Sequence, residues 1–194
     1  MKDAGTKGRE SRSRLMQAAV QEFAARGYHD AKVSSIVQAA GLTQAAFYLY
    51  FPSKEAIFEE ILDGFIEQLQ RIVQAMGEVA PLARDQVPDQ ILKNLKLVFG
   101  FLGAAPEMTR IALYESNRAA AVKDMIAQAM AAKIVGNQAA GKVRNDLPAG
   151  LIAECILGMV VHLTEKWLLT GVKTPDSIAE EMAPLLLHGI MNPK

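Results

Sequence analysis

Residues 33–55, VSSIVQAAGLTQAAFYLYFPSKE, constrain the fold of this chain more than any other segment. Apolar residues at helical spacing lead up to Gly41, where a backbone with positive φ can end a helix. Thr43 is a favourable N-cap for a second short helix over residues 44–50. The segment therefore predicts two short helices joined by a glycine turn, which is the helix-turn-helix arrangement.

The motifs in and around this segment resemble those of the tetracycline-repressor family (TetR/AcrR). The family pattern runs from small and aromatic residues in a first helix, through a Gly-Tyr pair and the glycine turn, to an aromatic-rich helix followed by Ser and Lys. Matching residues stand at the same spacing here: Leu15, Ala18, Ala19, Phe23, Gly27, Tyr28, Val33, Ile36, Ala40, Gly41, Leu42, Thr43, Phe47, Tyr48, Tyr50, Phe51, Ser53, Lys54 and Ile57. The resemblance covers about residues 12–62.

This resemblance implies a DNA-binding transcriptional regulator, specifically a repressor that a small molecule releases from DNA. Such proteins are homodimers whose two N-terminal heads bind an inverted-repeat operator in duplex DNA and whose last two helices pair. We therefore expect a cytoplasmic protein induced by a small hydrophobic or amphipathic compound. No cofactor, metal site or catalytic activity is expected.

The charge distribution agrees with a DNA-binding N-terminus. Residues 1–54 hold 8 Lys and Arg against 4 Asp and Glu, whereas residues 55–194 hold 13 against 17. A basic head suits contact with phosphates, although an asymmetry of this size is also compatible with chance.

Other features of the sequence argue against membrane insertion and secretion. No stretch reaches the roughly 20 apolar residues of a membrane span, and the first residues lack the apolar region of a signal peptide. Cys155 is the only cysteine, which excludes an internal disulfide and suits a reducing cytosol.

Helical periodicity along the chain predicts an all-α fold with about nine helices. Residues 1–54 form the expected N-terminal domain, a three-helix bundle with the helix-turn-helix behind a mobile arm at residues 1–9. Residues 55–194 form the expected C-terminal domain for ligand binding and dimerisation. The expected helices cover residues 11–26, 33–50 (two short helices), 53–76, 88–103, 106–116, 118–140, 148–170 and 175–191.

The second short helix carries the expected base contacts. Gln44 is the candidate for direct readout, because a carboxamide can bond adenine N6 and N7 together. Ala45 and Ala46 contact thymine methyl groups at most, or simply allow close approach. By resemblance, the hydroxyl groups of Tyr48 and Tyr50 contact phosphates.

Further phosphate contacts are expected at the starts of neighbouring helices. Ser53 is the expected N-cap of the fourth helix, which begins at Lys54 and whose N-terminal amides also suit an anion. Lys32 can reach a phosphate as a charge, while Ser34 and Ser35 offer hydroxyl groups, and Thr43 opens the second short helix. A solvated surface position is the alternative for each of these residues.

By resemblance, residues 80–170 enclose the ligand cavity. Met and aromatic side chains suit adaptable apolar pockets, although at helical spacing each is also an ordinary core residue. The candidates for the cavity lining are Phe99, Met108, Tyr114, Met125, Met159, His162 and Trp167, with Phe101 and Met130 as further possibilities.

An alternative interpretation is a helical-bundle ligand-binding protein or metal-dependent enzyme with a degenerate helix-turn-helix. His162 and Glu165 stand at i, i+3 on one helix, a spacing that carboxylate-bridged metal sites use. The matching Glu and Glu-x-x-His sets on facing helices are not evident, and Cys155 has no basic partner nearby in sequence. We therefore favour the DNA-binding regulator.

Overall fold

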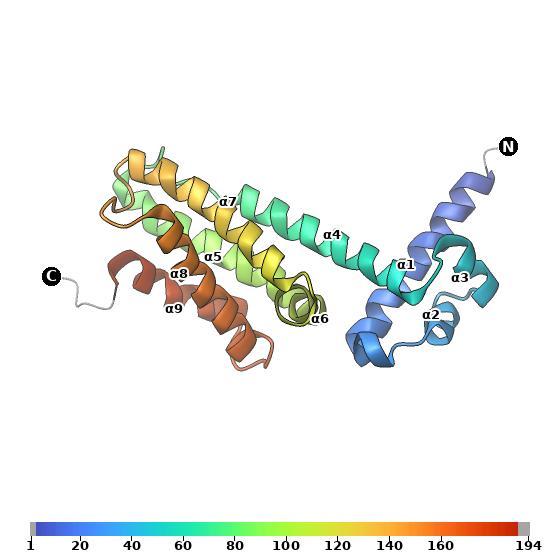
Figure 1. Ribbon diagram of the computed structural model, residues 1–194. Coiled ribbons are helices and arrows are strands. Elements are labelled where there is room, and N and C mark those ends of the chain that lie inside the picture. The colour runs from blue at the N-terminus through green and yellow to red at the C-terminus, as the bar shows by residue number, and fades with distance from the viewer. Residues whose placement is uncertain (1–2, 190–194) are drawn as a thin grey trace. The chain divides into compact units, whose positions relative to one another are not determined.

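The computed structural model describes residues 3–189, which form nine α-helices and no strand (Figure 1). This confirms the all-α prediction. The elements are α1 (Asp3–Asp30), α2 (Val33–Ala39), α3 (Gln44–Tyr50), α4 (Lys54–Ala75), η1 (Arg84–Gln86), α5 (Val87–Ala104), α6 (Pro106–Arg110), η2 (Ile111–Glu115), α7 (Ala119–Ala139), α8 (Ala149–Leu163), η3 (Thr164–Leu168) and α9 (Pro175–His188).

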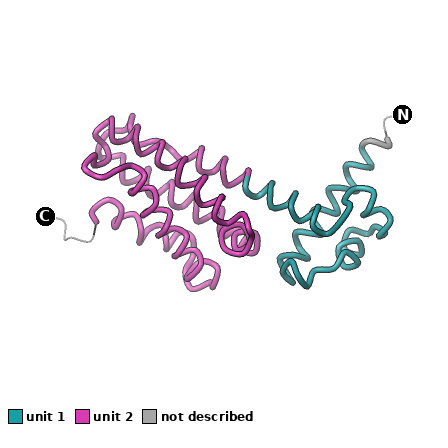
Figure 2. Tube along the Cα trace, viewed as in Figure 1, with its two compact units in different colours: residues 1–66 teal, residues 67–194 magenta. Residues whose placement is uncertain are grey.

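The chain divides into two compact units at Ile66 and Glu67, within α4 (Figure 2). The sequence placed the domain boundary earlier, between residues 54 and 55. The difference arises because the first turns of α4 bury Ile57 and Leu62 in the core of the N-terminal unit. The C-terminal half of the same helix buries Leu69 and Val73 in the other unit. We call these units the head and the body.

The first helix is longer than the sequence suggested. Residues 1–9 were expected to be a mobile arm, but α1 is helical from Asp3 onward, and Met1 and Lys2 lie outside the described residues. No proline interrupts this stretch, so a helix anchored by buried Leu15 can extend toward the N-terminus. At its other end the helical geometry breaks at Gly27, as expected, where φ is 73°.

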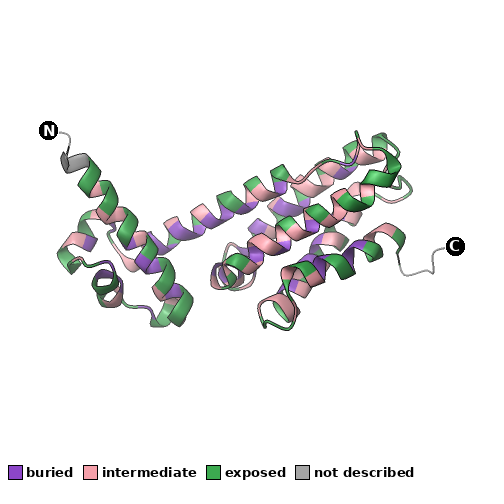
Figure 3. Cartoon of the chain, turned by 180° about the vertical axis from the view of Figure 1, so that it is seen from behind, coloured by how far each residue is buried: buried purple, intermediate pink, exposed green. Residues whose placement is uncertain are grey.

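In the body, α7 packs chiefly against α8 and α5 chiefly against α9. The residues coloured as buried lie along the faces of these helices that turn toward the other helices of the body (Figure 3). Two of the expected helices contain a wider π-helical turn near their ends, namely η2 after α6 and η3 after α8. The last helix was expected to reach residue 191, but residues 190–194 lie outside the described residues.

Candidate nucleic-acid interface and ligand cavity

The turn between α2 and α3 closes through local hydrogen bonds. The Leu42 amide donates to the Val37 carbonyl (2.8 Å) and the Gly41 amide donates to the Gln38 carbonyl (3.1 Å). Gly41 itself has φ 62°. These two bonds and the left-handed glycine form a Schellman motif, which satisfies the free carbonyls at the end of α2. The predicted glycine cap is thus confirmed.

Helix α3 is fixed by an N-cap at its first turn and by aromatic side chains that it buries in the head. The Thr43 hydroxyl oxygen accepts a hydrogen bond from the Ala46 amide (3.2 Å), as a predicted N-cap should. Phe47 is fully buried, and Phe51 follows it into the head core. A helix of seven residues is not stable alone, so burial of these rings keeps α3 in place.

The candidate base-reading residues of α3 differ in exposure. Gln44, Ala45 and Tyr48 are exposed, whereas Ala46 is half-buried. Tyr50 is also half-buried, and its hydroxyl lies beside Gly8 of α1. The exposed set therefore forms one accessible face of α3.

The start of α2 has no side-chain cap. Lys32 occupies the N-cap position and is exposed, in agreement with the expectation that it cannot cap. Ser34 is exposed and Ser35 is half-buried. Glu22 accepts from the Lys32 amide (3.4 Å) and forms an i, i+4 ion pair with Arg26 (3.2 Å).

Lys54 has a role that the sequence did not indicate. Its ammonium group donates to the backbone carbonyls of Tyr28 (2.8 Å), Ala31 (3.1 Å) and His29 (3.3 Å). It also lies 4.6 Å from the centre of the Tyr28 ring. An ammonium group has three hydrogen-bond donors, and here each one faces a carbonyl of the segment that follows the Gly27 kink. Lys54 therefore ties this segment to the start of α4.

A second bond supports the same junction. The Tyr28 hydroxyl donates to Glu55 Oε1 (2.8 Å). Burial and the adjacent Glu55 carboxylate raise the pKa of Tyr28 to about 12, so this hydroxyl keeps its proton at neutral pH. Ser53 completes the junction by capping α4 through the Ala56 amide (3.2 Å), as predicted.

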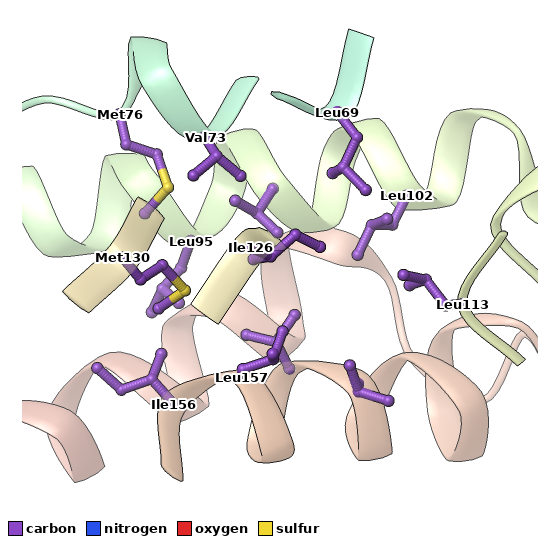
Figure 4. A pocket seen from close by; sticks show the side chains of 13 residues that line it. Leu69, Val73, Met76, Leu95, Leu102, Leu113, Ile126, Met130, Ile156 and Leu157 are labelled. Carbon is purple, nitrogen blue, oxygen red and sulfur yellow. The ribbon is translucent and has the colours of Figure 1, made fainter. Parts of the chain in front are cut away.

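The body contains a cavity of about 40 Å³, lined only by apolar side chains (Figure 4). They come from α4, α5, η2, α7 and α8, and from Met76, which directly follows α4. The cavity lies among Leu69, Val73, Met76, Leu95, Val98, Leu102, Leu113, Ile126, Met130, Ile156, Leu157, Val160 and Val161. Met76 and Met130 lie toward one end, and Leu102 and Leu113 toward the other.

None of the seven main candidates for the lining is part of it, whereas Met130, one of the two further candidates, is. Tyr114, Met125 and Met159 each stand one position from a lining residue, and one position turns a side chain by about 100° around a helix. Phe99 and Met108 are buried in the core, Trp167 packs under Lys173 (4.1 Å), and His162 is exposed. Apart from Met76 and Met130, the lining consists of branched aliphatic side chains, which occupy the inward face of each helix.

Tyr114 joins the two π-helical turns of the body. Its hydroxyl donates to the Val161 carbonyl (2.6 Å) and accepts from the Glu165 amide. In a regular α-helix this carbonyl and this amide would bond each other. Burial and the Glu165 charge raise the pKa of Tyr114 well above its usual value, so the hydroxyl remains a donor. The tyrosine hydroxyl is thus inserted into the hydrogen-bond ladder of α8.

We expect Tyr114→Phe to destabilise the body by about 1–3 kcal/mol, because the variant leaves a partly buried carbonyl and an amide without their partner. Thermal unfolding monitored by circular dichroism measures this loss. Tyr48→Phe is the matched control, since Tyr48 is exposed on α3. An unchanged melting temperature in Tyr114→Phe would show that α8 closes the Val161–Glu165 bond unaided.

No group of three His, Cys, Asp or Glu side chains in residues 3–189 is placed to hold a metal ion, and both His162 and Glu165 are exposed. Within the same range, no helix is both long enough and apolar enough to span a membrane.

Comparison with known proteins assigns the head to a family. The model of the "Bacterial regulatory proteins, tetR family" matches residues 15–61. The uncharacterized HTH-type transcriptional regulator YdgC of Bacillus subtilis (strain 168) is 40% identical over 186 residues, which are 96% of this chain and 95% of that protein.

Two solved structures share the whole fold. The fatty acid degradation regulator FadR from Bacillus halodurans matches with a TM-score of 0.74 at 24% identity, over 94% of this chain and 97% of that chain. FadR from Bacillus subtilis in complex with stearoyl-CoA matches with a TM-score of 0.68 at 21% identity, over 92% and 99%. From the family match, the long relative and the helix-turn-helix geometry, we conclude that this chain belongs to the TetR family of bacterial transcriptional regulators.

Proposed function

We propose that the protein is a homodimeric, cytoplasmic repressor that is released from an inverted-repeat operator by a ligand with a long apolar chain. The observation that carries the ligand class is the cavity of the body, whose lining is entirely apolar. Such a lining offers hydrocarbon contacts but no hydrogen bond. A fatty acyl thioester fits this chemistry, and stearoyl-CoA, which the FadR structure contains, is the first probe.

The size of the cavity suggests how a ligand acts on DNA binding. Its volume of about 40 Å³ is a few times the roughly 10–15 Å³ that a cavity needs to hold one water molecule, which is far too little for a long acyl chain. A long chain can therefore enter only if the surrounding helices separate. Two lining residues, Leu69 and Val73, belong to α4, the continuous helix that begins in the head, and Met76 directly follows its last residue. Ligand entry would then displace α4 and change the spacing of the two heads.

Dimerisation is proposed to use α8 and α9. In one chain, α8 leaves Leu151, Cys155 and Gly158 exposed along one face, although the helix is apolar over most of its circumference. A second copy would cover this face. We expect Cys155→Arg to convert the dimer to a monomer, because the variant places an unpaired charge in an apolar interface. Light scattering after size exclusion measures the mass; a dimer retained by Cys155→Arg would place the interface elsewhere.

The DNA contacts are proposed from the exposed residues of the head. Gln44 and Tyr48 of α3 face solvent, as do Lys32 and Ser34 at the start of α2. Half-site centres should be about 34–36 Å apart or a multiple of this spacing, because two heads related by a two-fold axis read the same face of the duplex. Footprinting on selected operator fragments tests the arrangement, and protection of a single non-palindromic half-site would contradict it.

The ligand proposal is tested with the same operator. Stearoyl-CoA should lower operator affinity roughly 5–150-fold, the usual range of coupling between two sites, and free CoA should not. If stearoyl-CoA binds the body but leaves DNA affinity unchanged, the regulatory part of the proposal fails and the DNA-binding part remains. The enzyme alternative is not favoured, because the relatives found are transcriptional regulators.

A further inference from the structure

Leu49 is the most exposed large hydrophobic side chain among the described residues. Its exposed fraction is 82%, compared with 66% for Val172, the next highest. Burying a leucine side chain stabilises a protein by about 1.5–3 kcal/mol. In the free protein, exposed Leu49 does not provide this stabilisation. An apolar side chain left in solvent on the helix-turn-helix requires a physical explanation.

The position of Leu49 on α3 is decided by the buried ring of Phe47. Leu49 follows Phe47 by two residues and Ala45 precedes it by two, which places both about 160° from Phe47 around the helix. These two side chains therefore point directly away from the head core. Gln44 and Tyr48 lie on the flank of the same exposed face. Whatever docks on α3 meets Ala45 and Leu49 first.

The chemistry of this pair is specific. Neither side chain has a hydrogen-bonding group, so the pair cannot read a donor or an acceptor on a base edge. In the major groove the apolar feature of a base pair is the 5-methyl group of thymine. We propose that Leu49, together with Ala45, recognises a thymine methyl group in each operator half-site and is a specificity-determining residue of this protein. This inference rests on the proposed DNA-binding function and names the base feature that α3 reads.

The test removes one methyl group from the DNA and nothing else. Operator duplexes are first selected from a random-sequence library with the full-length protein. Each thymine of the selected site is then replaced singly by uracil, which lacks the 5-methyl group and keeps the base-pairing edge. At one position per half-site, uracil should weaken binding about fourfold, which corresponds to the roughly 0.8 kcal/mol of one buried methyl group. Replacement in both half-sites should weaken it roughly tenfold or more.

Variants of the protein identify the side chain responsible. Leu49→Ala should bind the thymine operator more weakly and should bring the thymine-to-uracil ratio close to 1, since the methyl group has lost its partner. Gln44→Ala should keep the full ratio, because its amide acts on a different base feature. Val172→Ala is the control for an exposed apolar residue in the body and should alter neither affinity nor ratio. The melting temperature of Leu49→Ala should equal that of the wild type.

The outcomes separate the inference from the function on which it rests. If the library yields no preferred duplex, the proposed DNA-binding function fails. If a preferred operator is found but uracil is tolerated at every position, the thymine inference is overturned and the function stands. If Leu49→Ala weakens thymine and uracil operators equally, Leu49 contacts the sugar-phosphate backbone, and the inference is again wrong.

Discussion

Met130→Trp should abolish the response to stearoyl-CoA and leave operator binding close to the wild-type value. Met130 is a half-buried lining residue of α7, toward the same end of the cavity as Met76 (Figure 4). An indole ring there takes up the free volume of about 40 Å³, so an acyl chain can no longer enter. The wild-type decrease in operator affinity, roughly 5–150-fold, should fall to about 1. Fluorescence anisotropy of a labelled operator, titrated with stearoyl-CoA, measures both quantities.

Two controls make this result specific. Val135→Trp adds the same ring to an exposed position of α7 outside the cavity and should keep the full response. Overpacking should lower the free energy of unfolding of Met130→Trp by no more than roughly 1–3 kcal/mol, and thermal unfolding checks that the variant is folded. Gly158, an obvious small residue of α8 in the sequence, is unsuitable because it is exposed and does not line the cavity. A full response in Met130→Trp would place the ligand outside this cavity.

The second large effect is expected for Lys54→Ala, which should destabilise the head and weaken binding to all DNA sequences together. The variant leaves the carbonyls of Tyr28, His29 and Ala31 without their charged donor. Hydrogen bonds that involve a charged group are worth about 1.5–3 kcal/mol each. Because water can bind to the carbonyls that lose their donor, we expect the three bonds together to contribute only about 3 kcal/mol to the free energy of unfolding. Thermal unfolding in the absence of DNA measures the loss.

This measurement distinguishes two roles for Lys54. If Lys54 only contacts a phosphate, its replacement should lower the salt dependence of DNA binding by about one unit and leave the melting temperature unchanged. If Lys54 holds the junction of α1 and α4, its replacement should lower the melting temperature of the protein even without DNA. Lys32→Ala is the comparison, because Lys32 is exposed at the start of α2 and its side chain makes no capping bond. A normal melting temperature in Lys54→Ala would return Lys54 to the phosphate role.

The sequence by itself determined the parts of this protein that depend on neighbours along the chain. The αL glycine at Gly41 and the caps at Thr43 and Ser53 were all predicted correctly. Each of these bonds joins residues within five positions of each other, so the residue types alone specify the geometry. The helical periodicity likewise predicted about nine helices, and the described residues 3–189 form nine.

Tertiary structure decided the features that depend on how a helix is rotated against others. Leu113 rather than Tyr114 lines the cavity, and Ile126 rather than Met125, because a difference of one residue turns a side chain from the cavity toward another neighbour. Lys54 finds its three carbonyls 23 to 26 residues away, and Tyr114 finds Val161 at a separation of 47. No local pattern marks such partners, since only packing brings them within hydrogen-bond distance. The family and the helix-turn-helix could therefore be inferred from sequence, whereas the cavity lining and the long-range hydrogen bonds between helices required the folded chain.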